Sequence, residues 1–125
     1  MNTHSLAPYL QRFFVERLGT QLKASPNTIS SYRDTFRLLL KFAAGRLHRE
    51  PTALQLADID AELVGAFLAD IEATRGNAAR SRNTRLAAIR SFFKYVAVNE
   101  PQLLHHSQRV LACLRSAMRK EPSTT

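Results

Sequence analysis

The chain has 125 residues and a formal net charge of +8 at pH 7, with a pI near 10.6. This length is sufficient for one domain with a hydrophobic core and is too short for two. The strong positive charge favours a polyanionic partner, with nucleic acid first and an anionic membrane surface second. A membrane protein is not expected, because no apolar run approaches a bilayer span and the N-terminus lacks the pattern of a signal peptide.

Cys113 is the only cysteine in the sequence. A single cysteine excludes an internal disulfide and is typical of a reducing compartment, so we expect a cytoplasmic protein. Cys113 itself is expected to be a small apolar residue on the last helix.

Charge is distributed unevenly along the chain. Residues 50–72 contain six acidic residues and no lysine or arginine. The following stretch, Arg75–Val98, contains six basic residues and no carboxylate. This separation favours an oriented encounter with DNA over non-specific adhesion.

The first helix is expected to begin at Ser5 as its N-cap, with Pro8 at an early position where a missing N–H is tolerated. Gly19 is expected to end this helix, and residues 20–25 to form a short connection. Its predicted apolar face consists of Leu6, Leu10, Phe13, Phe14 and Leu18.

The second helix has the clearest start signal, because Ser25 can serve as N-cap and Pro26 as the first helical residue. We expect it to run to about Ala44 and to end at Gly45. Its predicted buried face consists of Ile29, Tyr32, Phe36, Leu39, Leu40 and Ala43.

Residues 46–59 lack a sustained helical period and are predicted to form a connection with one turn near residues 53–56. Asp58 or Asp60 is expected to cap the third helix, and Gly76 to end it. The predicted core positions of this helix are Leu63, Phe67, Leu68 and Ile71.

The fourth helix is expected to begin between Asn77 and Ser81 and to end near Asn99. Its apolar stripe consists of Leu86, Ile89, Phe93 and Val96. A short fifth helix is expected from Pro101, and the chain beyond Arg115 is predicted to be a polar tail. No strand pattern is present, so the sequence predicts an all-α bundle of four long helices and a short fifth helix.

Basic side chains flank the apolar stripe of the fourth helix. At about 100° per residue, Asn83, Arg90 and Lys94 lie along one flank and Arg85 lies on the other. Arginines near a helix N-terminus suit a phosphate backbone, although a solvated basic face would give the same pattern. On the second helix, small hydroxyls and cations could make groove contacts or serve as ordinary caps and surface residues.

Two segments resemble a known family. The run Ser25-Pro-Asn-Thr-Ile-Ser-Ser-Tyr32, followed by Arg33, resembles the second helix of the core-binding domain of tyrosine recombinases (phage integrases). The run Arg82-Asn-Thr-Arg-Leu-Ala-Ala-Ile-Arg-Ser-Phe-Phe-Lys-Tyr95 resembles the fourth helix of that domain, and Asn99-Glu-Pro101 is similar to the start of its fifth. The resemblance covers nearly the whole chain with helix order and spacing kept.

The resemblance implies a SAM-like helical DNA-binding domain over residues 1–114, forming the N-terminal half of a clamp around a recombination half-site. Residues 115–125 would be a polar tail or linker toward a catalytic domain. In this family the second and fourth helices meet the major groove. The implied DNA-binding residues are Lys23, Asn27, Thr28, Ser31, Arg33, Arg80, Arg82, Asn83, Arg85, Arg90 and Lys94.

The family's catalytic tyrosine and its Arg/Lys/His set belong to a C-terminal domain whose pattern is not found here. We therefore expect this chain alone to be no enzyme, to be a monomer in isolation, and to meet other recombinase subunits on double-stranded DNA. No metal or cofactor is expected, since the adjacent His105 and His106 point about 100° apart on a helix.

Three other hypotheses are compatible with the sequence. The first is a helical protein-interaction module whose basic face meets an acidic partner. The second is a stand-alone helix-turn-helix regulator, which the long connections disfavour. An independent enzyme is the weakest, because no nucleophile–base pair, metal set or phosphate loop is present.

Overall fold

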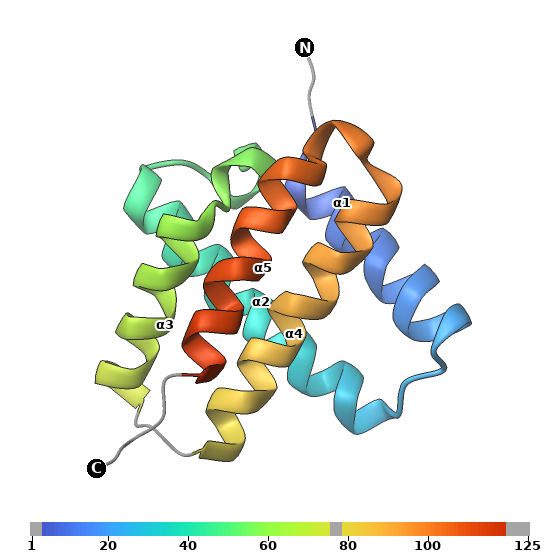
Figure 1. The fold of residues 1–125 in the computed structure, drawn as a ribbon, viewed down its shortest axis with the longest axis horizontal. Coiled ribbons are helices and arrows are strands. Elements are labelled where there is room, and N and C mark those ends of the chain that lie inside the picture. Colours follow the sequence, from blue (N-terminus) through green and yellow to red (C-terminus); the bar gives the residue numbers. More distant parts are fainter. Residues whose placement is uncertain (1–3, 76–78, 120–125) are drawn as a thin grey trace. The chain divides into compact units, whose positions relative to one another are not determined.

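The computed structural model describes residues 4–75 and 79–119, and within these ranges every regular element is helical (Figure 1). The α-helices are α1 (Leu6–Arg12), α2 (Pro26–Leu47), α3 (Ala61–Arg75), α4 (Ala79–Asn99) and α5 (Leu104–Arg119). The predicted all-α class is confirmed. The chain forms two compact units, residues 1–59 and 60–125, and each is described by itself. A single domain over residues 1–114 stays a prediction.

In the first unit, α1 continues directly into a π-helical segment, Phe13–Gln21. Gly19 lies inside this segment, so the prediction that it ends the helix was wrong. The N–H of Leu22 donates to the carbonyl of Arg17 at 2.9 Å, the five-residue spacing of a π-helix. A Cβ at Gly19 would lie 3.3 Å from the carbonyl oxygen of Phe14, and glycine avoids this close contact.

The start of α2 has the predicted cap. The Thr28 N–H donates to Ser25 Oγ at 3.1 Å, and Pro26 occupies the first turn. This bond satisfies one of the N–H groups that a helix start leaves without an intrahelical partner.

Replacing Ser25 with alanine is expected to lower the free energy of unfolding by about 1 kcal/mol, because the Thr28 N–H loses its acceptor. Urea denaturation followed by circular dichroism measures this change. A Ser25→Asp variant restores an acceptor and should recover most of the loss. Equal stabilities of all three proteins would contradict the capping role.

The end of α2 differs from the prediction. The helix continues past Gly45 to Leu47 and stops at His48, which has left-handed backbone angles (φ 56°, ψ 48°). The N–H groups of His48 and Arg49 both approach the carbonyl of Ala44, so the last turn is closed without a glycine. Nothing lies within 4 Å of a Cβ built on Gly45, so this glycine is not required by packing.

The connection after α2 packs into the core of the first unit. It contains two 3-10 turns, Pro51–Ala53 and Leu56–Asp58, where one turn was predicted. Leu54, Leu56 and Ile59 are fully buried. The Leu6 N–H donates to the carbonyl of Leu54 at 2.9 Å, so the start of α1 is held by the connection.

Ser5 occupies the N-cap position of α1, but its side chain makes no capping hydrogen bond. It forms an isolated antiparallel bridge with Gln55 instead. Ser5 therefore occupies the predicted N-cap position, but the predicted capping hydrogen bond is not formed.

In the second unit, Asp60 caps α3, because its Oδ1 accepts from the Leu63 N–H at 2.9 Å. Asp58, the other predicted cap, accepts from the Gln55 N–H at 2.8 Å in the preceding 3-10 turn. Gly76, the predicted end of this helix, lies outside the described residues. Of the predicted core positions, Leu63, Phe67 and Ile71 are buried and Leu68 is half-buried; Val64 is an additional buried residue.

Helices α4 and α5 form an antiparallel hairpin, and α5 contacts α3 on its other side (Figure 1). The predicted stripe of α4 is buried, and the buried face also includes Ala88, Phe92 and Tyr95. The Phe93 ring lies 6.1 Å from the His106 ring of α5, centroid to centroid. Aromatic and aliphatic side chains therefore join the two helices.

Helix α5 is not the short helix that was predicted. After a 3-10 turn at Pro101–Leu103 it runs for 16 residues to Arg119, beyond the predicted end of the domain at Leu114. Val110 and Leu114 are buried, whereas Leu104 is 43% exposed. Residues 120–125 of the predicted tail lie outside the described residues.

Within residues 4–75 and 79–119, no helix combines the length and the hydropathy that a bilayer crossing requires.

Candidate nucleic-acid interface

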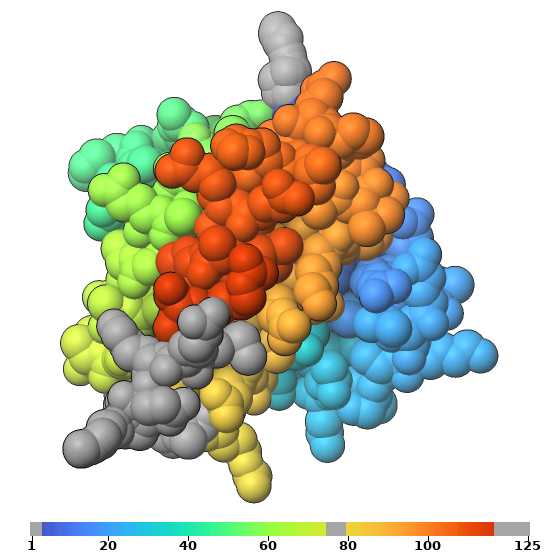
Figure 2. Space-filling model, in the orientation of Figure 1, coloured from blue at the N-terminus to red at the C-terminus, as the bar shows by residue number. Residues whose placement is uncertain are grey.

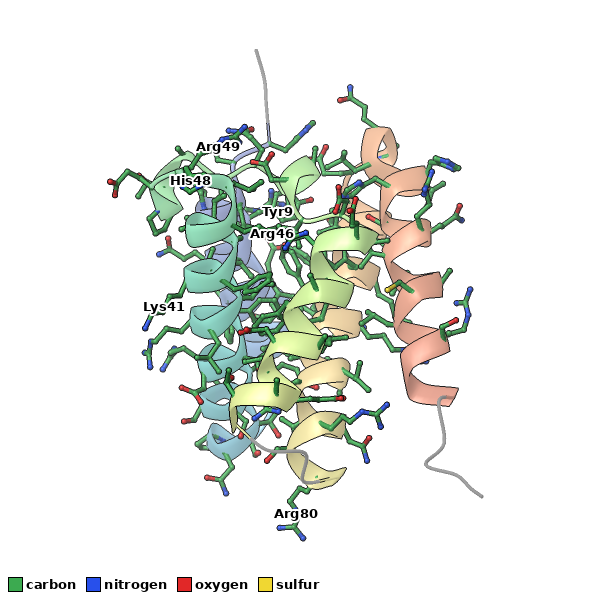
Figure 3. All side chains as sticks on the ribbon, turned by 90° about the vertical axis from the view of Figure 1, so that its left-hand side faces the viewer. Tyr9, Lys41, Arg46, His48, Arg49 and Arg80 are labelled. Carbon is green, nitrogen blue, oxygen red and sulfur yellow. The ribbon has the colours of Figure 1, made fainter. Side chains whose placement is uncertain are left out.

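One side of α4 is basic and exposed. Arg80, Asn83, Arg90 and Lys94 are all exposed and fall within an arc of about 80° around the helix axis, at about 100° per residue. This arc, the outer face of α4, is opposite the buried side of the helix. The Arg80 side chain extends away from the start of α4 (Figure 3).

No carboxylate neutralises this face from within the helix, because α4 contains no acidic residue. The first turn of a helix carries partial positive charge, so a cation there costs about 0.3–1 kcal/mol instead of stabilising the helix. Arg80 and Arg82 occupy this unfavourable position. An anion at the start of α4, such as a carboxylate or a phosphate, relieves this repulsion.

The remaining fourth-helix candidates do not belong to the outer face. Arg85 is half-buried and lies about 140° around the helix from Arg90. Arg82 turns toward α3, where its Nε–H donates to Glu72 Oε2 at 2.9 Å. The basic residues of α4 thus divide into an exposed set and two arginines on another side.

The second-helix candidates lie in the first unit, near the start of α2. Lys23, Asn27, Ser31 and Arg33 are exposed. Lys23 has a φ of 49°, which is uncommon for a residue with a Cβ. Asn27 and Ser31 lie about 40° apart around α2. Arg33 lies about 120° around the helix from Asn27 and farther still from Ser31. These residues do not share one face.

Thr28 is engaged in the cap of α2. Its hydroxyl accepts a hydrogen bond from Ser25 Oγ at 3.1 Å, and its N–H donates to the same oxygen. Thr28 is also half-buried. A structural role thus accounts for Thr28 without DNA.

Arg33 has a partner that the sequence pattern did not indicate. Its guanidinium carbon lies 5.9 Å from the centroid of the Phe14 ring, within the range of a cation–π contact. Phe14 in turn makes edge-to-face contacts with Phe13 and Phe36. The π-helical segment therefore helps to place a basic side chain of α2.

A second group of basic side chains occupies the C-terminal part of α2 and the residues after it. It consists of Lys41, Arg46, His48 and Arg49 (Figure 3). Arg49 pairs with Asp58, and Arg46 lies over the Phe42 ring at 5.9 Å. Basic residues at a helix C-terminus stabilise the helix dipole. Their presence in the sequence is therefore explained without a binding function.

The three tyrosines and the cysteine are buried or half-buried. Tyr9 and Tyr95 are buried, and burial raises the pKa of the half-buried Tyr32. Burial also raises the pKa of Cys113, whose thiol approaches the carbonyl of Ala61 at 3.6 Å. A raised pKa keeps these groups protonated and lowers their nucleophilicity. Among residues 4–75 and 79–119, no three His, Cys, Asp or Glu side chains gather as metal ligands would.

Comparison with known proteins identifies the family of the chain. A family model described as the phage integrase N-terminal SAM-like domain matches residues 10–100. The chain belongs to this family. The matched residues of this integrase domain include the starts of both α2 and α4, and thus both segments that carried the resemblance.

Curated relatives of this integrase domain have names that agree with the family. A putative integrase/recombinase y4rC of Sinorhizobium fredii (strain NBRC 101917 / NGR234) is 56% identical over 108 residues, which are 86% of this chain and 32% of the relative. A second protein of that strain, putative integrase/recombinase y4rD, is 49% identical and is covered to 38%. The tyrosine recombinase XerC of Pelotomaculum thermopropionicum (strain DSM 13744 / JCM 10971 / SI) is 35% identical over 66% of this chain and is covered to 27%.

The integrase domain therefore spans about a third of the length of the curated relatives that it matches. No solved structure matches it significantly.

Proposed function

We propose that this SAM-like integrase domain binds double-stranded DNA at a recombination half-site, with the outer face of α4 against the phosphate backbone. The observation that carries the proposal is the exposed arc of Arg80, Asn83, Arg90 and Lys94 on a helix without acidic residues. Arginine and lysine bind phosphates, and asparagine can hydrogen-bond a base edge, so this set can both position and read a duplex.

The start of α2 would supply a second set of DNA contacts from the first unit. Lys23, Asn27, Ser31 and Arg33 offer exposed cations and hydrogen-bonding groups there. Because Thr28 serves the cap, we propose it as the least important of the second-helix candidates for DNA affinity.

Strand exchange belongs, in this proposal, to residues of the recombinase other than those described here. The relatives are named integrase/recombinase and tyrosine recombinase. The chain spans about a third of the length of each of the two integrase/recombinase relatives. The described residues would bind and orient DNA in the cytoplasm and meet other recombinase subunits on it, while the isolated domain would be a monomer.

The salt dependence of binding tests the proposal. With about five phosphate contacts, the logarithm of the association constant should fall against the logarithm of salt concentration with a slope of about −4 to −5. Fluorescence anisotropy of a labelled duplex of about 30 base pairs, titrated between about 50 and 200 mM salt, measures this slope. Absence of binding at the lowest salt would reject the proposal.

The alternative of an acidic protein partner gives a different result in the same assay. Polyglutamate would then displace the labelled duplex as effectively as unlabelled duplex does. For the proposed DNA interface, unlabelled duplex should be the far better competitor, because phosphates and base edges occur together only in nucleic acid.

The location of the interface can be measured independently. Amide chemical shifts of the ¹⁵N-labelled domain should change on duplex addition at residues 28–33 and 80–94. Changes confined to α3 or to the C-terminal part of α2 would place the interface elsewhere.

A further inference from the structure

One arginine of the basic helix is already bound to an anion of the protein itself. The Nε–H of Arg82 in α4 donates to Glu72 Oε2 in α3 at 2.9 Å. Both side chains are partly accessible, with relative exposures of 22% for Arg82 and 38% for Glu72. The pair therefore lies at the surface, where dissolved or bound anions can reach it.

Arg82 occupies the first turn of α4, the part of the helix whose dipole and neighbouring arginine most favour an anion. Glu72 now supplies that anion. A carboxylate and a phosphodiester present the same kind of acceptor, a delocalised oxyanion, to the same guanidinium. The two groups are therefore competitors for one site.

We propose that Glu72 competes with DNA phosphate for Arg82 and thereby limits the sequence-independent affinity of α4; this inference rests on the proposed DNA-binding function. Glu72 is then a positioning residue, because it acts on DNA through Arg82. Partly exposed ion pairs are weak, so a phosphate in close contact can displace the carboxylate. A duplex that does not come into close contact with Arg82 gains less when phosphate replaces the carboxylate. The Glu72–Arg82 pair therefore weakens non-specific binding more than it weakens binding in a closely docked complex.

Glu72 opposes phosphate binding at the start of α4 in two ways. The Arg82 Nε–H points in one direction and already has an acceptor, so a phosphate must displace that acceptor or use other donors. The Glu72 carboxylate also repels any phosphate that approaches the start of α4. Removing the charge of Glu72 should therefore tighten DNA binding.

A purely structural role predicts the opposite sign. If the pair only holds α3 and α4 together, its loss should lower stability and weaken DNA binding. Glutamine has the shape of glutamate and keeps an oxygen acceptor for the Arg82 Nε–H, so Glu72→Gln removes the charge with little change in packing.

The decisive experiment compares Glu72→Gln with the matched control Asp70→Asn on a duplex of arbitrary sequence. Asp70 is exposed on α3, about 160° around the helix from Glu72, so its replacement removes the same charge from another side. Near 0.1 M salt, Glu72→Gln should tighten binding about 2- to 10-fold and steepen the salt slope by up to about one. Asp70→Asn should have a clearly smaller effect.

The same change in an Arg82→Gln background isolates the pair. There, Glu72→Gln should have a clearly smaller effect than in the unaltered protein, because the arginine that the carboxylate occupies is absent and only the repulsion of phosphate by Glu72 is removed. An effect of full size in this background would overturn the proposal, as would weaker binding by Glu72→Gln or an effect equal to that of Asp70→Asn.

The unaltered protein provides a measurement that does not depend on variants folding. The Arg82 Nε–Hε NMR signal should shift as duplex is added, because its acceptor changes from carboxylate to phosphate. A signal that stays unchanged while the duplex binds would overturn the role of Glu72 and leave the proposed function standing. Failure of the duplex to bind at all would overturn both.

Discussion

Replacing both Arg90 and Lys94 with glutamine is expected to weaken binding to duplex DNA about 10- to 100-fold near 0.1 M salt, with the salt slope flatter by about two. The two side chains are neighbours on the outer face of α4, and each would neutralise one phosphate. The loss should be similar for duplexes of different sequence, because phosphate contacts carry little sequence information. Anisotropy titrations at several salt concentrations measure both quantities.

The matched control replaces Arg109 and Arg115, two exposed arginines of α5 in the same unit. Both double variants reduce the formal net charge of +8 by two, so long-range attraction changes equally. The α5 pair should cost clearly less affinity than the α4 pair and should leave the slope nearly unchanged. Equal losses would mean that overall charge, and not the outer face of α4, governs binding.

Replacing Phe93 with alanine is expected to lower the free energy of unfolding by about 3–5 kcal/mol, because a fully buried ring is lost and a cavity remains. The Phe93 ring also packs against Phe92 at 5.2 Å and near His106 of α5. Since whole domains are stable by only about 5–15 kcal/mol, this variant should be largely unfolded at elevated temperature. Thermal and urea denaturation followed by circular dichroism measure the loss.

Val98 provides the control within the same helix. Its side chain is 80% exposed, and Val98→Ala should change the free energy of unfolding by no more than about 0.5 kcal/mol. A loss at Phe93 as small as that at Val98 would show that the α4–α5 hairpin is not held by its aromatic residues.

Local signals in the sequence predicted those parts of the fold that depend on local chemistry. Ser25 and Pro26 mark the start of α2, and the stripe of Leu86, Ile89 and Phe93 is buried in α4. Caps and helical periodicity involve residues within four positions of each other, so they can be recognised without knowing the tertiary structure.

Glycine does not mark the helix ends of this protein, although the sequence predicts that Gly19 and Gly45 do. Gly19 lies within a π-helical segment and Gly45 within α2, whereas His48 adopts the left-handed conformation. The half-buried Leu47 and the closure of the last turn onto Ala44 carry α2 past its glycine. A glycine permits a helix to end but does not require it.

The sequence predicts the positive charge of the candidate site but not the partners of its arginines. The absence of acids from residues 79–99 is visible in the sequence, and so is the flank formed by Asn83, Arg90 and Lys94. The contact of Arg82 with Glu72 joins residues ten positions apart on different helices, and the contact of Arg33 with Phe14 spans a longer distance in sequence. Such contacts depend on how helices pack, which residue spacing alone does not give.

The nine residues of π-helix from Phe13 to Gln21 also bear on how this stretch can differ among relatives. A π-turn contains one residue more than the α-turn that it replaces, because its hydrogen bonds span five residues instead of four. A relative with a single-residue deletion here is expected to form ordinary α-helix and to lose the need for glycine at the position of Gly19. Length variation of one residue, placed between Phe14 and Lys23, would thus be accommodated by a change of helix type without a new loop.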